Sequence, residues 1–114
     1  MKINGVVVPD PVSIRPRTVR VEKKRQTANG NTVIDFIGLK KEVQVSWGVL
    51  DDSEAKTIIN AIESSTNGFV ELTYPDVGGD TTITAYISNI DRKILSIYGG
   101  TIKWAYMSIT FRER

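Results

Sequence analysis

Alternation of apolar and polar residues runs through much of this chain and limits the fold more than any other feature. Its clearest example is the segment 42–49, whose apolar side consists of Val43, Val45, Trp47 and Val49. A period of two is the spacing of side chains on one face of a β-strand. The pattern returns at 70–74 and at 82–87. The sequence therefore predicts a mainly β protein of the α+β class.

Turn residues divide the remaining β-prone sequence into strands. The run 3–8 is a short strand that ends at Pro9-Asp10-Pro11, because proline cannot donate to a strand ladder. Asn29-Gly30-Asn31 tolerates positive φ and predicts the turn of a long β-hairpin over about 15–41. A hairpin loop is expected over 75–80, and a tight turn at Gly99-Gly100.

The last predicted strand, 101–111, changes its apolar face part-way along. Ile102 and Trp104 are in phase with each other, whereas Met107, Ile109 and Phe111 occupy the opposite phase. Such a change indicates either burial on both faces or a β-bulge near Ala105.

One helix is predicted, over about 52–65. Asp51 and Glu54 match a capping box, and Asn67-Gly68 supplies a C-terminal stop. Apolar residues recur at helical spacing and form one stripe, Ala55, Ile58, Ile59 and Ile62. We expect Ile58, Ile59 and Ile62 to pack on the sheet that carries Val43, Val45 and Trp47.

The expected architecture is an antiparallel β-sandwich or barrel with one flanking helix, in a single domain over 1–114. A chain of 114 residues is long enough to bury a core without disulfides or a metal. Hairpin arms of about ten residues would reach ~33 Å. The domain itself is only about 27 Å across by radius-of-gyration scaling. Part of the hairpin must therefore fold back on the body or project from it.

The chain contains no Cys and no His, which removes thiolate nucleophiles, the commonest general base and the commonest transition-metal ligands. No phosphate-binding or nucleophile motif is present. Asp76 and Asp80 lack the dense ligand run of a calcium loop, so a plain hairpin turn explains them better. We therefore expect no enzyme activity, no cofactor, no metal site and no small-molecule substrate.

The N-terminal run is too short for a signal peptide, and no apolar run approaches the ~18 residues of a membrane span. The sequence therefore predicts a protein made in a cytoplasm and not associated with a membrane.

Positive charge is concentrated in the first half of the chain. Residues 1–50 carry a balance of +5 and residues 51–114 a balance of −3. Six basic residues lie within the segment 15–25: Arg15, Arg17, Arg20, Lys23, Lys24 and Arg25. This cluster is typical of a contact surface for nucleic acid or for an acidic protein face. It is equally typical of a solvated strand whose charges discourage edge aggregation, and both interpretations stay open.

Several short blocks, in order along nearly the whole chain, carry a family resemblance. They are Lys2-Ile3-Asn4-Gly5-Val6 with Pro9 and Pro11, the segment 28–35 followed by Lys40-Lys41 and Trp47, Leu72-Thr73-Tyr74-Pro75-Asp76, Lys103-Trp104 and the terminal 111–114. In these blocks the chain resembles the small tail proteins, of about 110–120 residues, of long-tailed bacteriophages and prophages of Gram-positive bacteria. It departs from them in its dense basic segment and in Gly38-Leu39, where the family usually has Arg before the Lys pair.

The resemblance implies a structural component of the virion tail with no catalytic residues. It also implies the tail-tube fold of tube, terminator and distal-tail proteins, in which a β-sandwich with one helix assembles into hexameric rings. The expected partners are further copies of the chain and other phage tail proteins, with DNA passing non-specifically through the lumen. The alternative is a small basic nucleic-acid-binding β module.

We expect the long hairpin to be the main subunit contact, because a projecting ribbon has unpaired strand edges that need to be covered. The candidate contact residues are Arg15, Arg17, Arg20, Lys23, Lys24, Arg25, Asn29, Gly30, Lys40 and Lys41. A protein neighbour is favoured over DNA as the partner of this surface.

Overall fold

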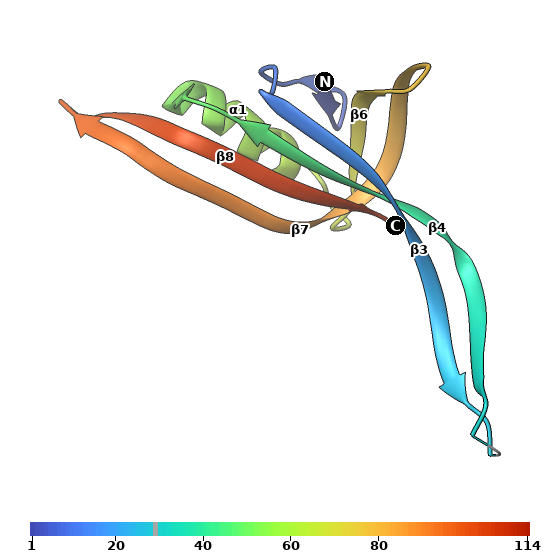
Figure 1. The fold of residues 1–114 in the computed structure, drawn as a ribbon. Helices are drawn as coiled ribbons and strands as arrows, with labels where there is room; N and C mark the ends of the chain where they lie inside the picture. Colours follow the sequence, from blue (N-terminus) through green and yellow to red (C-terminus); the bar gives the residue numbers. More distant parts are fainter. Residues whose placement is uncertain (29) are drawn as a thin grey trace.

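The computed structural model describes residues 1–28 and 30–114, and the side chains of all of these except 33–37. Strands make up most of it, together with one helix (Figure 1). In chain order the elements are β1 (Lys2–Ile3), β2 (Val6–Val7), β3 (Ser13–Gln26), β4 (Thr32–Trp47), β5 (Leu50–Asp51), α1 (Asp52–Glu63), β6 (Val70–Asp76), β7 (Gly79–Tyr98) and β8 (Thr101–Glu113). The mainly antiparallel β architecture with one flanking helix is confirmed.

The strands form one eight-stranded sheet in the order β2-β1-β6-β7-β8-β4-β3, with β5 beside β8. All its pairs are antiparallel. The sheet does not close, because β2 and β3 stand at its two ends and do not pair with each other. Instead it bends where β7 leaves β6 for β8, so that the β6–β7 hairpin stands up from the rest (Figure 1). The predicted sandwich or barrel is thus realised as one bent, open sheet.

The long hairpin is confirmed, and it projects from the body. Residues 42–47 of β4 pair with β8, whereas residues 18–26 of β3 and 32–41 of β4 pair only with each other in the sheet (Figure 1). We call this part of the hairpin the ribbon. It makes the molecule 69 Å long and only 29 × 28 Å across, with a radius of gyration of 17.9 Å. A compact chain of this length would have a radius of about 13 Å.

The core lies inside the bend of the sheet. The inward side chains of β4 and β8 alternate as the sequence predicts, and Val43, Val45, Met107, Ile109 and Phe111 are fully buried. Side chains of β1, β6 and the first part of β7 belong to the same cluster and face them: Ile3, Val70, Leu72, Tyr74, Ile83 and Ala85. Both halves of the bent sheet and the helix therefore share one core.

Helix α1 ends two residues earlier than predicted, and fewer isoleucines of its apolar stripe are fully buried than the sequence predicts. Glu54 Oε1 accepts a hydrogen bond from the backbone N–H of Asp51 at 3.2 Å, as the capping box requires. Ile58 is fully buried, whereas Ile59 and Ile62 are only partly buried against the core. The helix contacts β8, β5 and β1 of the same sheet that carries Val43, Val45 and Trp47, and Ile58 shares one buried cluster with these three residues, as predicted.

Two smaller features differ from or sharpen the predictions. The run 3–8 is not one strand, because Asn4 and Gly5 have positive φ and turn β1 back into β2. The change of apolar face in β8 is a β-bulge: Tyr106 pairs with Lys93 and Trp104 with Ile94, which leaves Ala105 unpaired. Between the two alternatives for this strand, the bulge near Ala105 is therefore confirmed.

Tyr74 has a buried side chain whose ionisation should weaken the fold. Its hydroxyl Oη has no hydrogen-bond partner among the described residues. Burial, and then the negative charges of Asp76 and Glu113, raise the pKa of Tyr74 above its usual value. The unfolded state would therefore release this proton first. The neutral Tyr74 hydroxyl therefore stabilises the folded state fully below the ordinary tyrosine pKa of about 10. This stabilisation is lost as the pH rises through the higher pKa that Tyr74 has in the folded state.

We expect the free energy of unfolding to fall between about pH 8 and about pH 10.5, and to fall less in Tyr74→Phe. Urea titrations of both proteins at the two pH values measure this difference. Comparing the two proteins cancels the ionisation of the exposed tyrosines. An equal fall in both would show that Tyr74 does not cause the alkaline loss.

Candidate subunit interface

The basic cluster lies along β3, the end strand of the sheet. Six of the predicted contact residues are exposed on this strand: Arg15, Arg17, Arg20, Lys23, Lys24 and Arg25. Gly30 lies in the turn between β3 and β4 with a φ of 83°, and Asn29 lies outside the described residues. Because β3 pairs with β4 on one side only, the cluster borders an open strand edge.

Acidic side chains of the same hairpin neutralise part of this charge. Glu22 Oε2 accepts a hydrogen bond from Arg20 Nε at 2.7 Å, and Lys24 Nζ lies 3.7 Å from Glu22 Oε1. The hydrogen bond from Arg20, helped by the positive charges of Arg20 and Lys24, holds the pKa of Glu22 below its usual value. Part of the basic cluster is therefore neutralised within its own hairpin.

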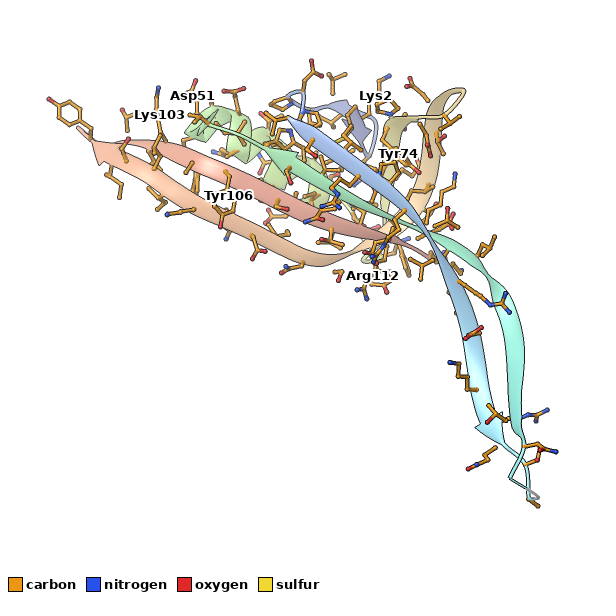
Figure 2. All side chains as sticks on the ribbon, in the orientation of Figure 1. Lys2, Asp51, Tyr74, Lys103, Tyr106 and Arg112 are labelled. Atoms are coloured by element: carbon orange, nitrogen blue, oxygen red, sulfur yellow. The ribbon has the colours of Figure 1, made fainter. Side chains whose placement is uncertain are left out.

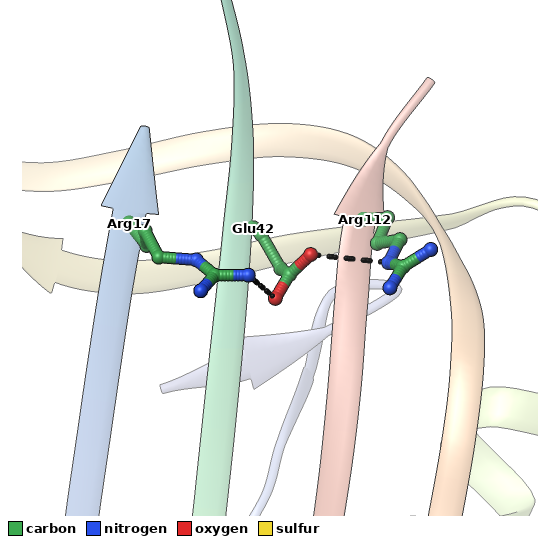
Figure 3. Close-up of polar contacts among 3 residues, drawn as sticks. All are labelled: Arg17, Glu42 and Arg112. Carbon is green, nitrogen blue, oxygen red and sulfur yellow. Dashed lines mark hydrogen bonds and ion pairs between the residues drawn. The ribbon is translucent and has the colours of Figure 1, made fainter. Parts of the chain in front are cut away.

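Glu42 joins three neighbouring strands on the face opposite the core. Its Oε1 accepts a hydrogen bond from Arg17 Nη2 of β3 at 2.6 Å, and its Oε2 lies 3.1 Å from Arg112 Nε of β8 (Figure 3). Only 18% of the Glu42 side chain is exposed, against 66% for Arg17 and 51% for Arg112. Two well-exposed guanidinium groups therefore share one carboxylate.

Beside this triplet is an open hollow of about 470 Å³. Arg112, one of its lining residues, lies near the point where the ribbon leaves the body (Figure 2). Its apolar part is formed by Val19 and Val21 of β3 and by Tyr86 of β7. Four basic and two acidic residues complete its lining: Arg17, Lys40, Lys41, Arg112, Glu42 and Glu113. The hollow thus combines apolar surface with an excess of positive charge.

Lys40 and Lys41 have contacts within the chain. Lys40 Nζ donates a hydrogen bond to the backbone oxygen of Arg114, and the backbone N–H of Lys41 donates to Glu113 Oε1 at 3.0 Å. Both lysines are half-buried. They fasten the end of β8 to the start of the ribbon, so they lie beside the basic residues of β3 without being equally exposed.

A second open strand edge lies on the other side of the sheet. Residues 79–85 of β7 pair with β6, but from Tyr86 to Tyr98 the strand pairs only with β8 within the described part of the chain. The end of this edge carries exposed apolar side chains, Ile94, Leu95, Ile97 and Tyr98. A row of unpaired backbone groups beside apolar side chains is a template for pairing with another chain.

Sequence reasoning did not identify this β7 edge, Glu42, Tyr86 or Arg112. The exposed run before Gly99-Gly100 could have indicated the edge, because a hairpin tip is normally polar. Nothing local marks Glu42 or Arg112, since each becomes part of the triplet only through the pairing of β4 with β8.

The described residues contain no group of three or more Asp, Glu, His or Cys side chains that could hold a metal ion. Searched over the same residues, the structure has no helix of the length and apolarity needed to cross a membrane. Among the exposed tyrosines, Tyr98 and Tyr106 belong to the β7–β8 hairpin and not to the basic strand, whereas Tyr86 of β7 lines the hollow together with Arg17 and Arg112. Trp47 is buried.

No protein-family model and no curated protein matches the chain. Among solved structures, it is similar to a chain described as "Virion of native gene transfer agent (GTA) particle". The TM-score is 0.48 at 12% sequence identity, over 91% of this chain and 81% of that chain. A similarity of this degree identifies neither a family nor a function.

Proposed function

We propose that this chain is a non-enzymatic structural protein of a bacteriophage or prophage tail, and that it assembles into rings, hexameric by the family resemblance. The observation that carries the proposal is the pair of long open edges, β3 on one side of the sheet and 86–98 of β7 on the other. The ordered sequence blocks that resemble small tail proteins supply the tail location, after synthesis in the cytoplasm of the bacterial host. Tail tube, tail tip and baseplate all suit this architecture.

The character of the two edges favours head-to-tail contact. Pairing β3 with a second β3 would bring two rows of basic side chains together, and proline at Pro16 also blunts this edge. The apolar end of the β7 edge carries no such barrier. Pairing β3 of one copy with β7 of the next uses two different surfaces. Repeated contacts of this kind form a ring when the rotation from one copy to the next returns to the first copy. In this assembly the ribbon would reach across the neighbouring copy.

The proposal predicts that charge on the β7 edge weakens assembly without unfolding the monomer. Leu95 and Ile97 are 55% and 66% exposed, so Leu95→Lys with Ile97→Lys leaves the core intact. We expect self-association to weaken at least about ten-fold, because two apolar contacts are lost and two charges are desolvated. Sedimentation over a range of concentrations, with circular dichroism to monitor folding, measures both properties.

Val49→Lys is the matched control, since Val49 is 62% exposed and lies on neither edge. Exposed Arg15 and Lys23 provide the corresponding test on β3, where Arg15→Glu with Lys23→Glu should also weaken association. A wild-type monomer at high concentration would contradict ring assembly by this chain alone. Affinity for DNA that falls steeply with salt would instead favour the nucleic-acid-binding alternative.

A further inference from the structure

The hollow beside the Glu42 triplet has the chemistry of a receptor for an acidic, apolar turn. Glu42 gives one carboxylate oxygen to Arg17 and the other to Arg112. Each guanidinium has five N–H donors, so most remain for a second carboxylate. Val19, Val21 and Tyr86 offer apolar surface directly beside these donors. A volume of about 470 Å³ is within the range of ligand pockets and suits a short peptide segment.

A turn with the complementary character lies elsewhere on the same chain. Val77 is 100% exposed at the tip of the β6–β7 hairpin, where Asp76 pairs with Gly79. Asp76 directly precedes Val77, and the exposed Asp80 lies three residues after it. Gly78 and Gly79 have φ values of 85° and 128°, which only glycine adopts readily and which fix the turn. Asp76 is half-buried, and its Oδ1 accepts a hydrogen bond from the backbone N–H of Val77 at 2.7 Å. The turn therefore presents an apolar side chain with one exposed carboxylate, that of Asp80, close to it.

We propose that the hollow of one copy receives the Val77 turn of a second copy. This inference rests on the proposed self-assembly and names the surfaces that it would join. Val77 would be buried against Val19, Val21 and Tyr86, while Asp80 would face the guanidinium groups of Arg17 and Arg112.

Two properties of the fold direct the turn to a different copy. The β6–β7 hairpin stands on the core side of the sheet and contributes its inner side chains to the core (Figure 1). The hollow lies beside Arg17, Glu42 and Arg112, which are on the opposite face of β3, β4 and β8. One chain therefore cannot fill its own hollow, and the contact is head-to-tail. Val19, Val21 and Tyr86 give the hollow an apolar part that a phosphate backbone cannot use, so a turn with an exposed apolar side chain fits the hollow better than DNA does.

Disulfide trapping tests the contact cleanly because the natural chain has no cysteine. A Val77→Cys chain is mixed with a Val19→Cys chain, so that only contact between copies gives the mixed dimer. We expect the mixed disulfide to form at least about ten times faster than in a mixture of Val77→Cys with Val49→Cys, because docking raises the local thiol concentration. Val49 is exposed outside the hollow and controls for random collision.

The negative charge of Asp80 should speed the disulfide cross-linking between copies. Adding Asp80→Lys to the Val77→Cys chain should slow cross-linking at least about five-fold, since the approaching turn would then meet like charge. Adding Glu71→Lys makes a matched change at an exposed residue of β6 outside the turn and should leave the rate unchanged.

Equal rates for the Val19→Cys and Val49→Cys mixtures, in protein that still forms rings, would overturn the docking contact and leave ring assembly standing. A protein that stays monomeric at every concentration would overturn both. Protection of Val19→Cys by DNA, without any mixed disulfide, would overturn the contact in favour of nucleic acid.

Discussion

Replacing Ile58 with alanine should lower the free energy of unfolding by about 2–5 kcal/mol. Ile58 is the fully buried isoleucine of α1, and the helix contacts β8, β5 and β1. Removing its side chain leaves a cavity between the helix and the sheet, which costs more than the transfer of the lost methylene groups alone. Urea unfolding followed by circular dichroism measures the loss.

Ile59→Ala is the matched control, because it is the same substitution at the next residue of the same helix. Ile59 is only partly buried, so its truncation should cost clearly less than that of Ile58. Equal losses at both positions, or a larger loss at Ile59, would contradict the orientation of the helix described above.

Replacing Trp47 with alanine should lower the free energy of unfolding by about 3–5 kcal/mol. Trp47 is 1% exposed, and its Nε1 donates a hydrogen bond of 2.7 Å to the backbone oxygen of Pro9. The substitution therefore empties a large part of the core and also removes one of the hydrogen bonds that join the N-terminal segment to β4. Trp47→Phe retains much of the apolar contact and separates the loss of the hydrogen bond, worth about 0.5–1.5 kcal/mol net, from the loss of packing.

Trp104→Ala provides the comparison, since the chain has only two tryptophans. Trp104 is half-buried, and its Nε1 donates to Asp52 Oδ1 at 3.1 Å near the start of α1. In each variant the remaining tryptophan reports unfolding by its fluorescence. A smaller loss for Trp47→Ala than for Trp104→Ala would contradict the central place of Trp47 in the core.

Features that depend on neighbouring residues could be predicted from the sequence. Alternation places Val43, Val45 and Trp47 on one face of a strand, and Gly99-Gly100 supplies the turn between β7 and β8. The capping residues place the start of α1, and the change of phase around Ala105 indicates the bulge. In each of these cases the controlling interactions lie within a few residues, so their pattern is written directly in the chain.

The candidate interface depends on residues that are distant in the sequence. The basic residues of β3 are visible as a cluster in the sequence, yet their ion pairs with Glu22 and Glu42 are not. The β7 edge was missed because its exposure depends on β6 pairing with β7 only as far as Ala85.

The sequence by itself thus determined the strands, the helix, the turns and the unequal distribution of charge. Only the tertiary structure decided that the sheet stays open, that the ribbon projects, and that Glu42 lies between Arg17 and Arg112. The physical reason is the separation along the chain between the residues that interact. Side-chain periodicity and turn chemistry act between near neighbours, whereas the free energy of pairing β4 with β8 comes from residues sixty to seventy positions apart. Which edges remain unpaired is settled only when all such pairings compete.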